Sequence, residues 1–266
     1  MKTSTHSAQK FTTQKREEVK DVLTYETPLQ ILVNDKPFSV TMQTPGNEAD
    51  LVRGILHSEN VFTQKNEILK TQTTGIDTVG NISAINAIIP ENMLDFGYSS
   101  NRSLTSVSSC GICGKEDLSG IELCGNPITD QTTFTLKEIN AMFDEMAAIQ
   151  ETFIASGGCH ASAAFGADKK MLACMEDIGR HNAVDKVIGH LLNNKKMEQA
   201  KIILVSGRVS YEIVSKAYYA GIPMLAAISA PSGLAVEMAE KYGITLLGFC
   251  RTDKLTAYSW AERVRL

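Results

Sequence analysis

The sequence predicts an α/β protein with two units, the larger built on a sheet that helices cover on both faces. The main evidence is the last third of the chain, where short apolar runs alternate with helical segments of about ten residues. The composition agrees with this class. A chain of 266 residues that is 43% hydrophobic and 21% charged is typical of a globular protein with one large or two small domains.

The first unit is expected over residues 21–108, after a polar segment at 1–20 that lacks the apolar stretch of a secretory signal and is predicted to be a flexible tail. Its elements follow in order. Two strands at 29–33 and 37–42 are joined by a turn, and a helix over 48–59 is expected to be capped by Asn47; alternation at 82–89 then predicts a strand that ends before Pro90.

The second unit is expected over residues 109–266. Thr135 and Glu138 have the spacing of a capping box and predict a helix that runs to about Gln150. A hairpin with strands at 161–165 and 171–175 precedes a helix over 181–192. The alternating part then follows, with strands at 201–206, 223–228 and 244–249 and helices at 211–220 and 232–241.

Charge and composition exclude several classes of protein. The net charge of −4 argues against general nucleic-acid binding, although a local basic pocket remains compatible with it. No apolar run approaches the roughly 18–20 residues of a membrane span. Six cysteines in a chain without an export signal favour reduced thiols, so a cytoplasmic location is expected.

The most informative motif is Ser109-Cys110-Gly-Ile-Cys113-Gly114, at the end of a serine-rich segment that is expected to be a mobile loop. Glycines beside both sulfurs leave them accessible. In such a spacing the second sulfur lowers the pKa of the first below the ~8.5 of a free thiol. Metal binding, redox exchange and sulfur transfer all fit this motif.

Three strand-to-helix or strand-to-turn segments in the last third are suited to an anionic ligand such as a nucleotide. Ligands of open α/β sheets gather at the carboxyl ends of strands, where helix N-termini present free N–H groups. The candidate residues are Ser206, Gly207 and Arg208 in the first segment, Ser229 and Ser232 in the second, and Phe249, Cys250, Arg251, Thr252, Asp253 and Lys254 in the third.

Two histidines have candidate roles. His181 and Asp185 lie four residues apart on one helical face, so the carboxylate is placed to orient the imidazole or raise its pKa. His160 follows Cys159 after a diglycine and is a candidate activator of a cysteine, although a hydrogen-bonded core histidine would look the same.

With these motifs, the chain resembles the FdhD/NarQ family, the formate dehydrogenase accessory sulfurtransferases, from about Glu26 to the C-terminus. The matching blocks occur in order. They are Glu26-Thr-Pro-Leu29, Thr44-Pro-Gly-Asn-Glu48, Ser109-Cys-Gly-Ile-Cys-Gly-Lys115, Ser156-Gly-Gly-Cys-His160, Glu176-Asp-Ile-Gly-Arg-His-Asn-Ala-Val-Asp-Lys186, Ser206-Gly-Arg-Val-Ser210, Ser229-Ala-Pro-Ser232 and Gly248-Phe-Cys-Arg251. The chain departs from the family at Ser156, where threonine is expected, and at His57, where an apolar residue is usual.

The resemblance implies a fold similar to cytidine deaminases, a mixed sheet with helices on both faces. It also implies a chemistry: a cysteine desulfurase passes sulfane sulfur to a cysteine persulfide, and the protein delivers it to the molybdenum cofactor of formate dehydrogenase. By motif, Cys110 corresponds to the persulfide carrier and Cys113 to its assistant. Residues 249–254 correspond to the stretch that holds the guanine nucleotide of bis-molybdopterin guanine dinucleotide, and a homodimer without a permanently bound metal is expected.

Two other functions remain as alternatives. A zinc deaminase would use His57-Ser58-Glu59 with the two loop cysteines, but Ser109 replaces the expected proline and about fifty residues intervene. A non-catalytic carrier of the molybdenum cofactor would need only the nucleotide pocket, with Cys110 and Cys113 as a redox or structural pair.

Overall fold

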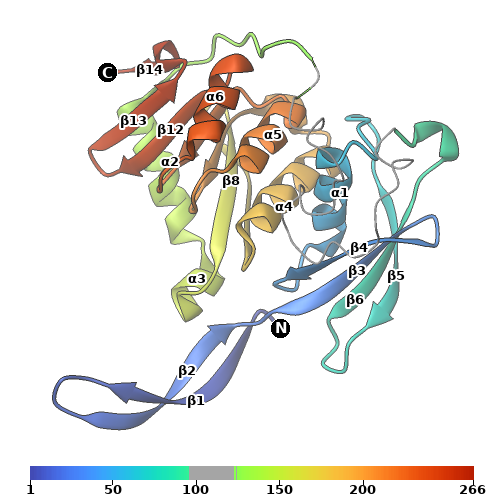
Figure 1. The fold of residues 1–266 in the computed structure, drawn as a ribbon, viewed down its shortest axis with the longest axis vertical. Coiled ribbons are helices and arrows are strands. Elements are labelled where there is room, and N and C mark those ends of the chain that lie inside the picture. The colour runs from blue at the N-terminus through green and yellow to red at the C-terminus, as the bar shows by residue number, and fades with distance from the viewer. Residues whose placement is uncertain (96–122, 124) are drawn as a thin grey trace.

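The computed structural model describes residues 1–95, 123 and 125–266 (Figure 1). Its larger unit is built on a six-stranded sheet in the order β13-β12-β11-β10-β8-β9. The three central strands β10 to β12 are parallel, and β8, β9 and β13 run antiparallel to their neighbours. The strands are β8 (His160–Gly166), β9 (Met171–Asp177), β10 (Ala200–Val205), β11 (Met224–Ala227), β12 (Thr245–Arg251) and β13 (Lys254–Ser259).

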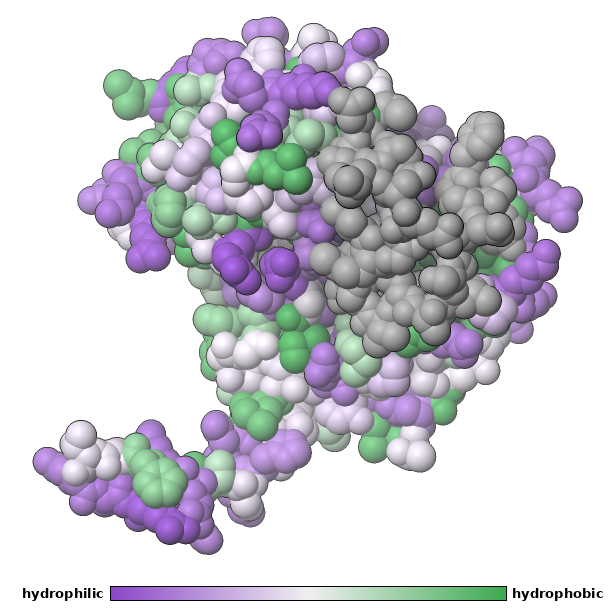
Figure 2. Space-filling view, in the orientation of Figure 1, coloured by the Kyte–Doolittle hydropathy of each residue, from purple (hydrophilic) through white to green (hydrophobic). Residues whose placement is uncertain are grey.

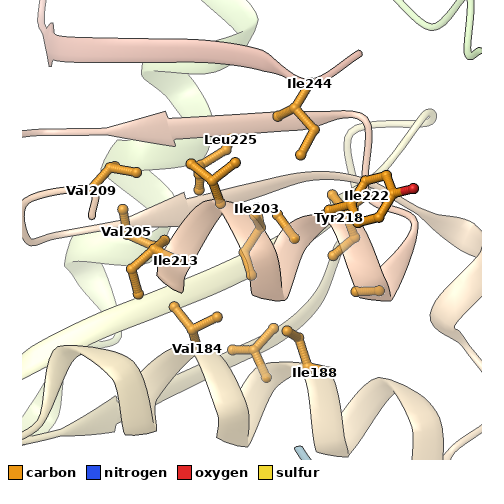
Figure 3. Packing of buried hydrophobic residues seen from close by; sticks show 14 of the residues in the cluster. Val184, Ile188, Ile203, Val205, Val209, Ile213, Tyr218, Ile222, Leu225 and Ile244 are labelled. Atoms are coloured by element: carbon orange, nitrogen blue, oxygen red, sulfur yellow. The ribbon is translucent and has the colours of Figure 1, made fainter. Parts of the chain in front are cut away.

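Helices cover both faces of this sheet, because its strands are apolar on both sides. Ile203 and Val205 of β10 face the core shared with three helices, and Ile202 and Leu204 face the core shared with a fourth. Figure 3 shows side chains of the first core converging from helices and strands. The helices are α4 (Arg180–Asn193), α5 (Tyr211–Ala220) and α6 (Gly233–Lys241) on one face and α2 (Leu136–Ala148) on the other.

The smaller unit has a four-stranded sheet in the order β4-β3-β6-β5, packed on one helix. Its strands are β3 (Thr27–Val33), β4 (Lys36–Gln43), β5 (Lys70–Ile76) and β6 (Ile82–Ile88), and its helix is α1 (Glu48–Ser58). Asn34 and Asp35 both have positive φ, so the turn between β3 and β4 is of the tight hairpin kind. Leu29 and Ile31 from the sheet and Leu51 and Leu56 from α1 are fully buried in its core.

The two units meet where α1 crosses α4, and two glycines permit that approach. A Cβ on Gly54 would lie 2.0 Å from the Asp185 carbonyl oxygen, and a Cβ on Gly189 would lie 1.8 Å from the Asp50 carbonyl oxygen. Both distances are shorter than any van der Waals contact, so the backbones touch directly. The crossing therefore fixes the position of the start of α4 relative to the smaller unit.

The N-terminal residues form an arm of two antiparallel strands, β1 (Thr3–Phe11) and β2 (Arg16–Thr24). It extends away from the body and stands as a separate, mostly hydrophilic lobe (Figures 1 and 2). At the base of the arm, Thr24 Oγ1 lies at a hydrogen-bond distance of 2.7 Å from Ser156 Oγ. Ser156 is the last residue of α3 (Glu151–Ser156). The sequence predicts a flexible tail over residues 1–20, whereas the structure forms paired strands there. The strands lack an apolar face, so hydrophobic alternation does not reveal them.

The C-terminal residues return to the start of the larger unit. The short strands β7 (Phe134–Thr135) and β14 (Val264–Arg265) pair in parallel. The buried guanidinium of Arg263 donates to the carbonyls of Asp130 (2.8 Å), Gly243 (2.7 Å) and Ile128 (3.2 Å). Three short 3₁₀ helices complete the described elements, at Glu91–Met93, Met197–Gln199 and Ala261–Arg263.

The structure confirms the predicted fold class, an α/β protein with a mixed, helix-covered sheet and a smaller N-terminal α/β unit. The Thr135–Glu138 capping box is present. Asn47 behaves differently from the expectation: it adopts a left-handed conformation before α1 and makes no side-chain cap, while Glu48 accepts a bond from the Gly46 amide at 2.7 Å. In the described part of the chain, none of the helices combines the length and apolarity needed for a membrane span. The division into domains at residue 108 falls outside the described residues.

Candidate functional site

The segments that the sequence singled out as ligand-binding turns lie along one edge of the six-stranded sheet. Parallel strands end at the same edge, so the residues after β10, β11 and β12 come together there. The antiparallel strand β8 begins at this edge with His160, which pairs with Asp177 at the end of β9. Helix α4 starts directly after β9, so its N-terminus belongs to the same edge.

Backbone hydrogen bonds join the three turns to one another. The Val209 amide donates to the Ala230 carbonyl at 3.1 Å, and the Ser232 amide donates to the Val209 carbonyl at 2.9 Å. The Phe249 amide donates to the Ser229 carbonyl at 3.2 Å. The edge is therefore one continuous, hydrogen-bonded rim rather than three independent loops.

The first turn carries a hydroxyl, an open backbone and a cation. Ser206 Oγ accepts a hydrogen bond from the Ala161 amide at 2.9 Å and lies 3.3 Å from His160 Nδ1. Gly207 is buried against the His160 ring, and Arg208 is exposed. Burial and the nearby guanidinium groups of Arg180 and Arg208 lower the pKa of His160. The neutral form of the imidazole is therefore favoured.

The second turn uses its hydroxyl groups structurally. Ser232 is the N-cap of α6, and its Oγ accepts a hydrogen bond from the Ala235 amide at 3.2 Å. Ser229 is half-buried and holds the Phe249 amide through its carbonyl oxygen. Its backbone thus joins the second turn to the last part of β12.

The third segment presents an aromatic ring and charges to solvent. Phe249 has a φ of 52° and is 41% exposed, an uncommon conformation for a bulky residue and one that is often found at functional sites. Arg251, Thr252, Asp253 and Lys254 are exposed at the tight connection between β12 and β13. Cys250 lies in the core beneath them, with 3% of its surface exposed.

The pairing of His181 with Asp185 is wrong. His181 is buried, and its Nε2 lies 3.2 Å from Ser210 Oγ and 3.9 Å from a Glu212 carboxylate oxygen. Asp185 instead accepts hydrogen bonds from Lys216 Nζ at 2.7 and 2.8 Å. Helical spacing places both groups on α4, but α5 and its N-cap residue Ser210 supply closer partners for each. Burial, Lys216 and Arg180 lower the pKa of His181 to about 4.

A buried polar network centred on Asp177 holds the start of α4 in place. Asp177 is fully buried and forms an ion pair with Lys186 Nζ at 2.8 Å. Its carboxylate also accepts bonds from the amides of Thr44 (3.1 Å) and Gly179 (2.8 Å) and from the Asn182 side chain (3.0 Å). Much of the polar motif 176–186 therefore positions the site instead of contacting a ligand.

The described cysteines are all poor nucleophiles. Burial raises the pKa of Cys159 and Cys174 to about 12 and that of Cys250 to about 11. A thiol with such a pKa is protonated at pH 7 and unreactive. Cys110 and Cys113, the predicted reactive pair, lie outside the described residues, as does Cys124.

Sequence reasoning missed Arg180, the first residue of α4. Its Cδ is 3.4 Å from where a Cβ on Gly207 would lie, so α4 brings a second guanidinium to the first turn. The sequence feature that could have identified Arg180 is its position at the polar start of a predicted helix, next to His181. His57, which the deaminase alternative would use as a ligand, is buried, and its Nε2 contacts the Tyr219 carbonyl at 3.1 Å.

The edge as a whole is chemically suited to a polyanionic ligand. It presents two arginines near α4 and further cations at the β12–β13 turn, together with helix N-termini and an exposed aromatic ring. Guanidinium groups and free N–H groups bind phosphate oxygens, and an aromatic ring offers a surface on which a base can stack.

Comparisons with known proteins agree on one family. The model of the FdhD/NarQ family matches residues 24–265. A Mycobacterium bovis protein named "Sulfur carrier protein FdhD" is 41% identical over 256 residues, which cover 92% of each chain. A Sulfolobus acidocaldarius protein of the same name is 36% identical, again over 92% of each chain. A Desulfotalea psychrophila protein assigned as a formate dehydrogenase accessory protein shares the fold, with a TM-score of 0.77, 20% identity and 99% of each chain covered.

Proposed function

This chain belongs to the FdhD/NarQ family, and on that premise we propose that it is a sulfur carrier that serves the maturation of formate dehydrogenase. Sulfane sulfur is received from a cysteine desulfurase as a persulfide on Cys110. It is then delivered to the molybdenum cofactor, bis-molybdopterin guanine dinucleotide, which is the acceptor substrate. The protein acts as a sulfurtransferase in the cytoplasm, as a homodimer.

The observation that carries this proposal is the state of the other cysteines. A persulfide carrier needs a thiolate, and the raised pKa values of Cys159, Cys174 and Cys250 make these three thiols unsuitable. Of the six cysteines, the pair at Cys110 and Cys113 has the glycine flanks and the spacing that favour a reactive thiolate. The names of the relatives support the same chemistry.

The loading step is an exchange at sulfur. The Cys110 thiolate attacks the terminal sulfur of the donor's persulfide, a new S–S bond forms on Cys110, and the donor cysteine leaves as a thiolate. No net oxidation occurs, so no further reactant is required. Cys113 assists by stabilising the thiolate of Cys110 before the attack.

The basic sheet edge is assigned to the acceptor. The guanine nucleotide part of the acceptor carries phosphates, which suit the cations and helix N-termini of this edge. The segment from Phe249 to Lys254 holds the nucleotide in this proposal, with Ser206, Gly207, Arg208 and His181 on the neighbouring turn and helix. Buried Cys250 contributes to the shape of the segment through packing and not through its thiol.

The test is mass spectrometry after incubation with a cysteine desulfurase and cysteine. We expect a mass gain of one sulfur atom on the peptide that contains Cys110, and loss of that gain in Cys110→Ala. Cys174→Ala, at a half-buried cysteine of β9, is the matched control and should still be loaded. Loading of the Cys110→Ala protein at the wild-type level would reject the carrier assignment.

The Cys110→Ala variant also distinguishes the proposed sulfurtransferase from a non-catalytic carrier of the molybdenum cofactor. A protein that only carries the molybdenum cofactor would not need the thiol of Cys110. We therefore expect Cys110→Ala to bind guanosine diphosphate normally and to fail to activate formate dehydrogenase. Activation at the wild-type level would favour the non-catalytic carrier.

A further inference from the structure

The arm of β1 and β2 leaves the edge of β1 open along the strand. In the described part of the chain the arm is a two-stranded sheet, and no other strand pairs with either of its edges. The side chains of β1 are exposed from Thr5 to Phe11. A two-stranded ribbon is marginally stable by itself in water, and added strands stabilise it. The open edge of β1 is therefore a candidate surface for another strand.

The base of the arm is attached to both units of the body, so the arm has a defined direction. The amino group of Met1 donates to Asn81 Oδ1 at 2.8 Å, and Asn81 lies in the turn between β5 and β6 of the smaller unit. On the larger unit, Thr24 Oγ1 lies 2.7 Å from Ser156 Oγ of α3. Beyond this base the arm stands clear of the body (Figures 1 and 2), which leaves its outer part accessible to a partner.

The register of the ribbon determines which backbone groups of β1 point outward. The Tyr25 amide donates to the Lys2 carbonyl at 2.8 Å at one end, and the Thr12 amide donates to the Lys15 carbonyl at 2.9 Å at the other. Hydrogen-bonded and non-hydrogen-bonded pairs alternate along an antiparallel ladder, and the register between these ends has no shift. The even-numbered residues of β1 therefore bond β2. The N–H and C=O groups of the odd-numbered residues from 3 to 11 point to the open edge.

The two edges of the ribbon differ in charge. Five of the nine residues of β2 are charged: Arg16, Glu17, Glu18, Lys20 and Asp21. Charged side chains on an edge strand oppose pairing with a second sheet. Strand β1 carries one such residue, Lys10, with His6 as its other titratable side chain, and it has no proline and no bulge. Of the two edges, that of β1 is the one suited to strand addition.

We propose that β1 pairs with β1 of a second copy of this chain, antiparallel and around a two-fold axis at Ser7. With the axis at this central residue, every residue of the strand has a partner. Ser7 then lies opposite the partner's Ser7, and Thr3 lies opposite the partner's Phe11. These pairs consist of odd-numbered residues, so the outward N–H and C=O groups of the two copies bond each other. The two ribbons become one continuous sheet.

The side chains fit this register without contacts between like charges. Lys10 lies opposite the partner's Ser4, and His6 lies opposite the partner's Ala8. An axis one residue earlier would place His6 opposite the partner's His6, and an axis one residue later would place His6 opposite the partner's Lys10. In both shifted registers two basic side chains would face each other, which is unfavourable. The axis at Ser7 avoids both contacts.

This pairing gives an interface to the homodimer named in the proposed function, and it rests on that homodimer. Residues 1–23 lie outside the family match, so membership of the family does not predict the contact. The interface joins only the two arms. It therefore leaves the unfolding of the body almost unchanged.

Sedimentation velocity of the full chain over a range of protein concentrations tests the pairing. Ser7→Pro removes an amide that points to the open edge and keeps the bonds of the even-numbered residues within the arm. We expect it to weaken dimerisation by about 10-fold or more, because hydrogen bonds at the axis are lost. Ser7→Ala keeps the amide and is the matched control, which should dimerise as the wild type does.

Cysteine cross-linking tests the register without weakening the contact. The Cα atoms of an opposed, hydrogen-bonded pair are about 5.5 Å apart, which is within the range of a disulfide. Under mild oxidation, Ser7→Cys should therefore give a linked dimer, in which mass spectrometry finds two copies of the peptide that contains position 7. Gln9→Cys, on the same face of β1, is the control. Its two copies would lie about 14 Å apart and should not link.

Equal dimerisation of Ser7→Pro and the wild type, or equal linking of Ser7→Cys and Gln9→Cys, would overturn the arm pairing and leave the homodimer to another surface. A wild-type protein that sediments as a monomer would overturn both the pairing and the homodimer. Larger, open-ended assemblies would overturn the two-fold register. Sulfur loading of Cys110 is measured separately, so it decides the carrier assignment whatever the arm does.

Discussion

Single buried side chains decide how this protein responds to acid. His57 and His181 are both buried, and burial lowers the pKa of each to about 4. In the unfolded chain both return to about 6.5. Between these values the unfolded state binds more protons than the folded state, so stability falls as the pH falls from about 6.5 to 4.

The unfolding free energy should therefore drop as the pH is lowered from 7 to 5, by up to about 1.4 kcal/mol per pH unit for each histidine. His57→Gln removes one of the three histidines whose pKa is lowered, His57, His160 and His181, and should show a smaller drop. His6→Gln, at an exposed residue of the arm, is the control and should match the wild type. Urea unfolding at several pH values measures this, and equal slopes for His57→Gln and the wild type would contradict the prediction.

The sequence predicts most residues of the candidate site, but it does not predict which residues contact them. Ser206, Arg208 and Arg251 were predicted because they follow apolar strands, and ligands gather where parallel strands end. The role of Arg180 and the partners of His181 and Asp185 depend on which helix packs beside α4. Helical spacing cannot show that Ser210, Glu212 and Lys216, from the N-cap and body of α5, supply these contacts, because the contacts are tertiary.

At the scale of elements, the crossing of α1 and α4 leaves no space for a side chain. Gly189→Ala gains about 1 kcal/mol of helix propensity but forces a methyl group to 1.8 Å from the Asp50 carbonyl oxygen. We expect a net loss of roughly 3 kcal/mol of unfolding free energy, at the upper end of overpacking costs. Gly233→Ala is the control, since its methyl group would meet nothing within 4 Å. Denaturant unfolding gives both values, and equal stability of the two variants would refute the close crossing.

The elements that the sequence predicted share one property, which is an apolar face or run. Strands β10 to β12 and helices α4 to α6 bury continuous apolar surface, so their periodicity is strong. The arm strands β1 and β2 are largely exposed and carry polar residues on both sides, so no period marks them. The two-residue strands β7 and β14 are too short for any pattern, and they form because residues 264–265 pair with residues 134–135.

At the scale of the whole molecule, the arm and the C-terminus contribute differently to stability. The arm is a two-stranded ribbon joined to the body near its base, and such a ribbon is marginally stable alone. Residues 1–23 also lie outside the family match.

Deleting residues 2–23 should therefore shift the melting temperature by less than about 4 °C, the change that 1 kcal/mol produces in a domain of this size. Deleting residues 263–266 should instead lower it by far more, because the carbonyls of Ile128, Asp130 and Gly243 lose the donors of Arg263. Differential scanning fluorimetry compares the two truncations. A larger loss from the N-terminal deletion would show that the arm belongs to the cooperative core.

The pairing of β14 with β7 also sets the order of events during synthesis. These strands join residues about 130 positions apart. Arg263 donates hydrogen bonds to the Asp130 carbonyl and to the Gly243 carbonyl, which lies just before β12. A chain that is being synthesised therefore cannot pair β7 or supply the donors of Arg263 until residues 263–265 have been translated. The end of the sheet opposite the ligand-binding turns is thus held in place only after all six strands of the sheet have been synthesised.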